Sequence, residues 1–194
     1  MAFDRDQALE RAMRVFWQKG FEGASLNDLT AAMGIRPPSL YAAFGNKQDL
    51  FAECLERYLA GQVAFMNQSL QEPTAYQVAS RMLRQTAEFL TGNNPRCGCM
   101  AVESALVGGE ESAPIRRKLI RIRVKGQEAL KHRFERAMSE GDLPHTTDAA
   151  DLARFVVTIL QGMTIQSSNG ATRDELLRLA EMALRAWPAQ PRAM

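Results

Sequence analysis

Apolar residues along this chain recur mostly every three or four positions, the spacing that places them on one face of an α-helix. The strict alternation of apolar and polar residues that is typical of strands is nearly absent. Capping residues, glycines and prolines divide the periodic stretches into about nine helices. The sequence therefore predicts an all-α protein.

The most distinctive pattern, Ser25–Lys47, consists of two short predicted helices joined by a glycine turn. Its first residue, a serine, is suited to cap the first helix, and Gly34 is suited to end it in the left-handed conformation. Pro37 suits the first position of the second helix, because its missing N–H would have no partner there anyway. Leu40 and Phe44 give that helix one apolar stripe. Such a pair forms a helix-turn-helix unit, whose second helix enters the DNA major groove, so DNA binding is the leading hypothesis.

The other predicted helices flank this unit on both sides. One precedes it, from Asp4 to Gly20, and a long one follows, from Asn46 to about Met66. The rest of the pattern predicts helices over residues 74–89, 99–107, 112–140, 147–165 and 172–187. We expect the first three helices to form an N-terminal unit and the others to form a larger helical bundle.

The composition is that of an ordinary globular chain, with 46% of the residues hydrophobic and 24% charged. No apolar stretch reaches the roughly 18 residues that a membrane-spanning helix needs. The N-terminus lacks the basic and apolar regions of an export signal. Three cysteines, Cys54, Cys97 and Cys99, are too few for the disulfide framework of a secreted protein. We therefore expect a cytoplasmic protein with reduced thiols and no membrane segment.

The net charge alone does not indicate a nucleic-acid-binding protein, because the formal charge at pH 7 is only +2. The local distribution changes this picture. Between Gly34 and Gln48 the chain has two cations, Arg36 and Lys47, and no acidic residue. This positive window permits contact with DNA phosphates.

Residues 16–50 resemble the start of the TetR family of bacterial transcriptional regulators. From Gly34 onward the segment reads GIRPPSLYAAFGNKQDL, and GCMAVESAL further along is similar to the sixth helix of several members. The residues that carry the resemblance are Phe16, Gly20, Ser25, Leu29, Gly34, Ser39, Leu40, Tyr41, Phe44, Lys47 and Leu50. The resemblance implies a helix-turn-helix DNA-binding domain over residues 1–46 and a helical effector-binding and dimerisation domain over residues 47–187. Residues 188–194 are expected to form a flexible tail.

What the resemblance implies for function is a ligand-responsive repressor that works without a cofactor. Its homodimer is expected to bind a pseudo-palindromic operator with half-sites about one helical turn apart. A small-molecule effector is expected to release it. An all-helical enzyme is the rival reading, but paired carboxylates, a phosphate-binding loop and a Ser-His-Asp set are not recognisable, so no catalytic residue is expected.

Candidate DNA contacts lie on the two helices of the helix-turn-helix unit and at the start of the next helix. Ser39 and Tyr41 resemble the family's phosphate- and base-contacting positions, and Lys47 at a helix start is suited to meet a phosphate. Arg36 stands where Ser or Thr usually caps the helix, and its guanidinium is suited to guanine or phosphate. The two alanines after Tyr41, which we expect to face outward, offer only methyl groups. The expected DNA-binding residues are Ser25, Asn27, Arg36, Ser39, Tyr41, Ala42 and Lys47.

The helical body is expected to hold the effector pocket and the dimer interface. The candidate pocket residues are Met66, Met82, Phe89, Cys99, Met100 and Met163. Methionine suits an adaptable apolar pocket, although filling of the core explains these residues equally well. The last two helices, over about residues 148–187, carry more apolar residues than one buried face needs. This excess predicts that the homodimer forms through them.

The cysteines leave two readings open. A zinc site is not expected, because Cys54, His132 and His145 are the other candidate ligands for the Cys97–Cys99 pair and none stands at a recognised spacing. Some TetR-type regulators with a similar segment sense electrophiles or oxidants at a cysteine. Cys99 is therefore either such a sensor or a buried structural residue.

Two further alternatives concern charge. The helix over residues 114–138 carries nine cations, which form a solvated face or point toward an anionic effector or the DNA. Residues 1–60 carry seven basic and eight acidic residues, so a helical adaptor that has lost DNA binding also remains open.

Overall fold

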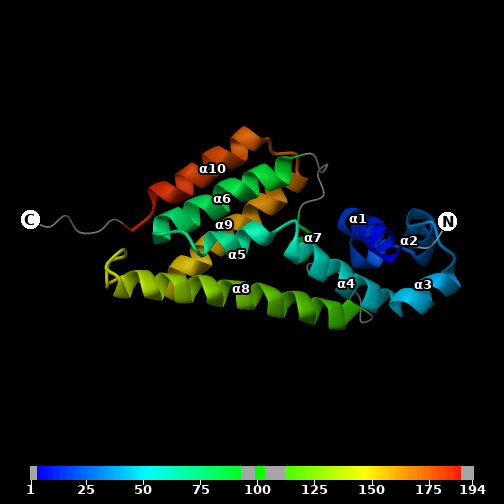
Figure 1. Ribbon diagram of the computed structural model, residues 1–194. Coiled ribbons are helices and arrows are strands. Elements are labelled where there is room, and N and C mark those ends of the chain that lie inside the picture. The colour runs from blue at the N-terminus through cyan, green and yellow to red at the C-terminus, as the bar shows by residue number, and fades with distance from the viewer. Residues whose placement is uncertain (1–3, 93–98, 104–111, 189–194) are drawn as a thin grey trace, which may run out of the picture. The chain divides into compact units, whose positions relative to one another are not determined.

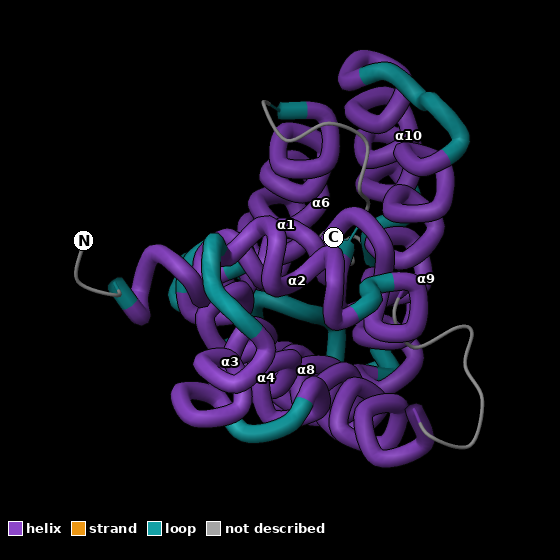
Figure 2. The backbone as a smooth tube through the Cα atoms, turned by 90° about the vertical axis from the view of Figure 1, so that its right-hand side faces the viewer, coloured by secondary structure: helices purple, strands orange, loops and turns teal. Residues whose placement is uncertain are grey.

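The structure is a computed structural model that describes residues 4–92, 99–103 and 112–188. These residues form ten helices joined by turns and loops, and they contain no strand (Figure 1; Figure 2). The all-α prediction is therefore confirmed, with ten helices in the described residues where the sequence predicted about nine. The helices are α1 (Arg5–Gly23), α2 (Leu26–Met33), α3 (Pro37–Phe44), α4 (Lys47–Ala60), α5 (Ala64–Ser69), α6 (Ala75–Thr91), α7 (Met100–Glu103), α8 (Ala113–Ser139), α9 (Ala149–Ser168) and α10 (Arg173–Arg185).

The extra helix arises because the long helix predicted from Asn46 to about Met66 is interrupted. Helix α4 ends at Ala60, and the N–H of Gly61 makes the last regular helical bond, to the Arg57 carbonyl. Glycine is a poor helix former, so the ladder is easily lost at this position. The chain turns and begins again as α5 at Ala64.

The chain divides into two compact units. The first comprises residues 1–64 and 99–120, and the second comprises residues 65–98 and 121–194. The sequence predicted a boundary after residue 46, between a DNA-binding domain and an effector-binding domain. The compact units do not divide there, because residues 1–64 belong to one unit, and the division by function stays a prediction.

In the first unit, α1 packs against α2 and α4 and forms the centre of the helical head. The Phe16 and Phe51 rings meet edge to face with centroids 5.0 Å apart, and Trp17 and Tyr58 do so at 5.1 Å. These four aromatic side chains are buried. Edge-to-face pairs stabilise a core beyond the burial of their area, so α1 and α4 provide a rigid support for α2 and α3.

In the second unit, α6, α9 and α10 pack against one another, and Figure 1 shows them side by side. Their apolar faces meet in a core that includes Val78, Leu83, Val156, Leu160 and Leu184. Thr74 and Thr172 cap α6 and α10 through capping boxes, whereas α9 is capped by Asp148, one residue after the predicted Thr147. No helix in the described part of the chain is long and apolar enough to cross a membrane.

Candidate DNA-binding surface

Most of the candidate DNA contacts lie on one exposed face of α3. The helix begins with Pro37 at its first position, as predicted, and it buries only Leu40 and Phe44. Its other side is open, and the exposed candidates there are Arg36, Ser39, Tyr41 and Ala42. The tyrosine among them is 49% exposed, so its ring and hydroxyl are available to a partner.

Arg36 is the N-cap residue of α3 but makes no capping bond with its side chain. Within the described part of the chain its guanidinium has no hydrogen bond or ion pair, and the residue is exposed. The planar fork of donors of an arginine matches the guanine O6/N7 edge or a phosphate, and this one is exposed to such a partner.

The turn before α3 follows the predicted geometry. Gly34 ends α2 with φ +70°, and its N–H donates to the carbonyls of Ala31 and Thr30. This left-handed conformation favours glycine. The turn sets the angle between the two helices and so presents α3 on the surface.

Ser25 and Asn27 lie at the N-terminus of α2. The Ser25 hydroxyl accepts from the Asp28 N–H and the Asp28 carboxylate accepts from the Ser25 N–H, as a capping box requires. The hydroxyl also donates to the same carboxylate at 2.7 Å. The Lys19 ammonium donates to the same carboxylate at 2.6 Å. These bonds, with Lys19 first and Ser25 second, hold the pKa of Asp28 well below its usual range. The serine hydroxyl is therefore engaged within the protein, whereas Asn27 is exposed.

Lys47 is the first residue of α4, and its Nζ lies 4.7 Å from the centroid of the Phe21 ring. Asn46 caps this helix, and its N–H donates to the Asp49 carboxylate at 3.1 Å. The Asp49 carboxylate is therefore engaged inside its own helix start, as the Asp28 carboxylate is. The lysine is half-buried, and its charge lies at the N-terminus of a helix, the end that favours an anion such as phosphate.

Arg5 is a residue that the sequence did not single out. Its Nε and Nη2 donate to the Ala43 carbonyl at 3.3 and 3.2 Å, and Nη2 lies 2.8 Å from both carboxylate oxygens of Glu53. Its guanidinium carbon lies 4.4 Å from the centroid of the Phe44 ring. Ala43, predicted to face outward, is partly buried at this point.

The predicted pocket residues fall in both compact units. Met82 and Met163 lie in the core of the second unit, and Met66 and Phe89 pack against it. Cys99 and Met100 belong to the first unit, where Met100 is buried. In this structure Met82 and Met163 fill the interior of the second unit, and the assignment of an effector pocket to the six residues stays a prediction.

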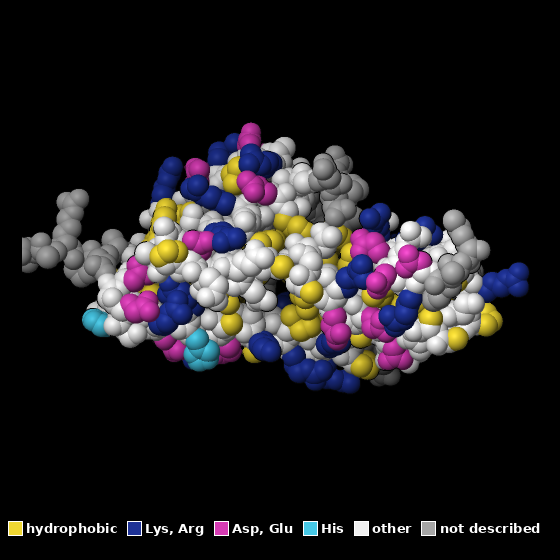
Figure 3. All heavy atoms as spheres, in the orientation of Figure 1, with side chains coloured by type: hydrophobic (Ala, Val, Ile, Leu, Met, Phe, Trp, Pro, Cys, Tyr) yellow, Lys and Arg dark blue, Asp and Glu magenta, His cyan; other side chains and the backbone are white. Residues whose placement is uncertain are grey.

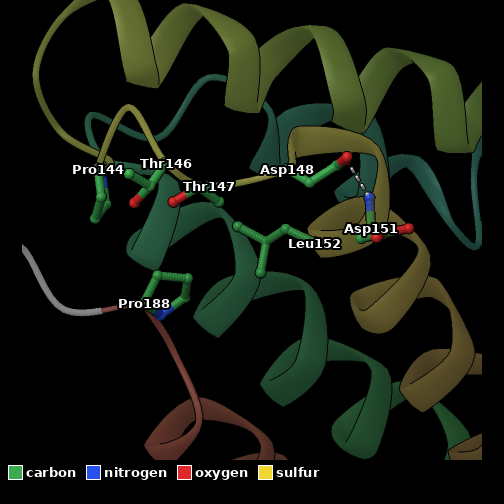
Figure 4. Close-up of a pocket in the computed structure, with 7 residues that line it drawn as sticks. All are labelled: Pro144, Thr146, Thr147, Asp148, Asp151, Leu152 and Pro188. Carbon is green, nitrogen blue, oxygen red and sulfur yellow. Dashed lines mark hydrogen bonds between the residues drawn. The ribbon is translucent and has the colours of Figure 1, made fainter.

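An open depression in the second unit lies elsewhere, and none of the six predicted pocket residues lines it (Figure 4). Leu152 lies between the loop that precedes α9 and Pro188 near the end of the described chain. Asp148 in its wall accepts the Asp151 N–H at 2.9 Å, which is part of the cap of α9. The residues that line it are Pro144, Thr146, Thr147, Asp148, Asp151, Leu152 and Pro188.

The two described cysteines differ in their environments. Cys54 is fully buried in α4, and burial raises the pKa of its thiol. Cys99 is partly exposed, and its sulfur accepts a hydrogen bond from the Tyr58 hydroxyl at 3.3 Å. Cys97 lies outside the described residues. Among the residues that are described, no three His, Cys, Asp or Glu side chains gather closely enough to hold a metal ion.

The basic helix α8 carries exposed cations and one buried cation, and a contact of any of them with an effector or with DNA stays a prediction. Lys and Arg side chains gather along part of it on the face shown in Figure 3, whereas Arg133 is buried. Nη2 of Arg133 donates to the Glu72 and Pro73 carbonyls at 2.9 Å each, while Nε and Nη1 have no partner in the described structure. Burial lowers the pKa of this guanidinium. The helix therefore presents a solvated basic face and one cation used to hold the chain before α6.

Comparison with known proteins agrees with this geometry. The sequence model of the family described as "Bacterial regulatory proteins, tetR family" matches residues 8–54. The transcriptional repressor ComR of Escherichia coli strain K12 is 32% identical over 96% of this chain and 90% of its own length. The repressor BdcR of the same strain is 28% identical over 93% of this chain and 87% of its own.

Solved structures extend the match to the whole fold. A cysteine mutant of the TetR family regulator CifR, complexed with 26-bp double-strand operator DNA, is 44% identical with a TM-score of 0.92, and the match covers 97% of this chain and 99% of that chain. These relatives are transcriptional regulators and not enzymes, as predicted for this chain. The chain therefore belongs to the TetR family of bacterial transcriptional regulators.

Proposed function

We propose that this protein is a transcriptional repressor whose homodimer binds a pseudo-palindromic operator and is released by a small-molecule effector. The observation that carries the proposal is the open face of α3. Arg36, which has no partner among the described residues, and the half-exposed Tyr41 lie on this face, above the buried Leu40 and Phe44. The ComR and BdcR repressors and the operator-bound CifR mutant support the same function.

In the DNA complex, α3 lies in the major groove and its exposed residues divide the contacts. Arg36 donates to guanine or to a phosphate, and the Ala42 methyl packs against thymine methyls. The hydroxyl groups of Ser39 and Tyr41 donate hydrogen bonds to phosphates or bases. Lys47 reaches a phosphate from the start of α4, and Asn27 contacts the backbone from the start of α2. Ser25 joins this contact by exchanging the bond that its hydroxyl donates to Asp28 for one to a phosphate.

The homodimer forms through α9 and α10. Phe155 and Ile165 on α9 are 37% and 39% exposed, and Met182 on α10 is 65% exposed. Large apolar side chains that stay exposed on two adjacent helices indicate a surface that a partner covers. Gly162 lies between the first two on the exposed side of α9, and a Cβ there would meet nothing within 4 Å. A glycine within a helix costs about 1 kcal/mol relative to alanine, and the close approach of a second helix would account for it.

The effector acts by stabilising an arrangement of the dimer that does not fit two successive half-sites. A ligand shifts such an equilibrium only by the difference in its affinity for the two arrangements. A hundredfold preference, about 2.7 kcal/mol, shifts a ratio of about 10:1 between the two arrangements to about 1:10. The candidate pocket residues in the second unit are Met66, Met82, Phe89 and Met163.

Selection from a random library of duplex DNA tests the proposal. We expect the wild-type protein to enrich a pseudo-palindrome with half-sites about 10 bp apart, and the affinity to fall steeply as salt rises. A folded dimer that enriches no duplex would exclude DNA binding and would favour the adaptor alternative.

The contact between Tyr58 and Cys99 favours a second candidate function, the sensing of electrophiles or oxidants. A hydroxyl that donates to sulfur stabilises the thiolate, which is the nucleophile. The Tyr58 ring packs against Trp17 of α1, so a group added to the sulfur would disturb the support of the DNA-binding helices.

Stoichiometric N-ethylmaleimide tests this candidate. The Cys99 thiolate would add to the maleimide double bond, forming a thioether while the adjacent carbon takes up a proton. We expect wild type to release the selected duplex and Cys99→Ser to retain it, with the modified residue identified by mass spectrometry. Equal release by both proteins would exclude Cys99 as the sensor.

A further inference from the structure

Helix α3 has few interactions that fix its orientation. It is eight residues long, too short to be stable alone in water, and it buries only Leu40 and Phe44. Its last residues carry backbone carbonyls without helical partners. Whatever binds the end of α3 therefore determines how its exposed face is presented.

Arg5 binds that end. One guanidinium donates to the Ala43 carbonyl at 3.2 Å, lies against the Phe44 ring at 4.4 Å and pairs with Glu53 of α4 at 2.8 Å. We call this set of four residues, Arg5, Ala43, Phe44 and Glu53, the Arg5 bridge. It joins the first residue of α1 to the last turn of α3 and to the middle of α4.

The position of Arg5 in its own helix supports a tertiary role. A cation at a helix N-terminus is unfavourable for that helix, because the N-terminal end already carries partial positive charge. The same cation at the C-terminus of α3 is favourable, because that end carries partial negative charge. Arg5 therefore contributes to α3 rather than to α1.

We infer that Arg5 is a positioning residue for DNA recognition and that the Arg5 bridge holds α3 at the angle at which its exposed face meets the major groove. This inference rests on the proposed function. Arginine suits the role because its planar fork donates to a carbonyl and a carboxylate at once while its face covers an aromatic ring. Isolated ion pairs on a surface contribute little to stability. The Arg5 guanidinium differs because it contacts a carbonyl, a carboxylate and an aromatic ring at the same time, and these contacts together fix its position.

Two neighbouring ion pairs join α1 to α4 and do not involve α3. Arg57 of α4 pairs with Glu10 at 3.2 Å and with Asp6 at 3.4 Å, both on α1. These contacts fix α1 to α4, so the Arg5 bridge connects α3 to a support that is already held together.

The competing explanation is that Arg5, whose side chain is 47% exposed, contacts a DNA phosphate directly. The two explanations differ in what they predict for Glu53→Gln. That substitution breaks the ion pair of the Arg5 bridge. It also removes a negative charge, which by itself favours binding of the negatively charged DNA. Weaker DNA binding is therefore expected only if the bridge positions α3. A direct phosphate contact predicts unchanged or tighter binding.

The test compares Arg5→Met, Arg5→Lys and Glu53→Gln with wild type, on the duplex that wild type selects from a random library. Arg14→Met is the matched control, because Arg14 is also an exposed arginine of α1 and its ion pair is with Glu10 of the same helix. We expect about tenfold weaker binding for Arg5→Met and about threefold for Arg5→Lys and Glu53→Gln. Arg14→Met is expected to bind within twofold of wild type. The slope of log K against log salt is expected to stay unchanged in Arg5→Met, whereas loss of a phosphate contact lowers it by about one.

Hydrogen exchange gives a readout that needs no DNA. In Arg5→Met and Glu53→Gln we expect faster exchange at residues 40–45, with wild-type exchange in α2. Unchanged exchange at residues 40–45, or wild-type affinity in Glu53→Gln, would overturn the inference. If wild type selects no duplex at all, the proposed function fails, and the exchange data still decide whether Arg5 holds α3.

Discussion

The ammonium of Lys19 lies 2.6 Å from a carboxylate oxygen of Asp28, nine residues further along and in the next helix. The carboxylate also closes the capping box of α2 by accepting from the Ser25 N–H. One side chain therefore fixes the start of α2 and joins it to α1. Because this contact needs an ionised carboxylate, it makes the helical head sensitive to acid.

We predict that Asp28→Asn flattens the dependence of stability on pH at the acid end. The folded pKa of Asp28 is lowered, first by Lys19 and then by Ser25, so the unfolded chain binds a proton at a higher pH than the folded one. Stability from this group is complete above the ordinary aspartate pKa of about 3.9 and is lost as the pH falls below it. Urea unfolding of wild type and Asp28→Asn at a series of pH values from 6 downward measures the difference, which we expect to shrink toward the acid end.

Asp49→Asn is the control for a general effect of removing a carboxylate, since Asp49 also closes a capping box but has no lysine partner in the described structure. A wild-type pH profile that runs parallel to that of Asp28→Asn would contradict the prediction.

Glycines with φ near +70° on either side of α3 give a second prediction. A Cβ at Gly45 would lie 2.6 Å from Oδ2 of Asp49, which closes the capping box of α4, whereas a Cβ at Gly34 would meet nothing nearer than 3.6 Å. Gly34 is in the left-handed region, where alanine costs about 1–2 kcal/mol, whereas Gly45 has φ +73° and ψ −136°, outside that region, where alanine is less favourable still. Gly45→Ala also displaces the cap, so denaturant unfolding should show a larger loss for Gly45→Ala than for Gly34→Ala.

Gly126→Ala is expected to raise stability rather than lower it, because Gly126 is within α8 and a Cβ there would meet nothing within 4 Å. We expect it to stabilise the protein by up to about 1 kcal/mol. Equal losses at Gly34 and Gly45 would contradict the prediction, because both the backbone conformation and the contact with Asp49 make alanine less favourable at Gly45.

What the sequence could predict is what lies close along the chain. The capping boxes of Ser25 and Asn46 each join residues three positions apart, and the glycine turn at Gly34 is equally local. The Arg5 contacts span 38 and 48 residues, and helical periodicity does not encode which helix end lies beside which. Ala43 was expected to face outward for the same reason, since the arginine that donates to its carbonyl comes from α1.

The recognition surface leads to a third prediction, that Arg36→Ala weakens binding of the selected duplex without affecting the fold. Arg36 has no partner within the described chain, so its removal leaves no protein group unpaired. A base contact is worth about 1–3 kcal/mol, and its loss would relax selectivity at one base pair. A phosphate contact would instead lower the salt slope by about one. Fluorescence anisotropy over a range of salt, on the selected duplex and on single-base variants, separates the two cases.

Tyr41→Phe tests the neighbouring side chain in the same assay, because it removes the hydroxyl and keeps the half-exposed ring. Weakened binding would indicate a hydroxyl contact. Arg36→Ala with wild-type affinity and wild-type selectivity would remove Arg36 from the set of proposed contacts.

The exposed apolar side chains of α9 give the last prediction, that Phe155→Glu dissociates the proposed homodimer. A carboxylate at the centre of an apolar interface would be buried without a partner, which costs several kcal/mol and raises the dimer dissociation constant at least about 30-fold. Gly162→Leu is expected to act in the same direction by filling the space that a second helix would occupy. Sedimentation velocity over a range of protein concentrations measures both.

Val124→Glu is the matched control, because Val124 is 56% exposed on α8, outside the proposed interface, and receives the same new charge. We expect this variant to sediment as wild type does and Phe155→Glu to sediment as a folded monomer with wild-type helical content. The monomer should also bind the selected duplex more weakly and with a lower salt slope, since one head makes half of the phosphate contacts. A wild-type chain that sediments as a monomer, or a dimer that survives Phe155→Glu and Gly162→Leu alike, would place the interface elsewhere than on α9 and α10.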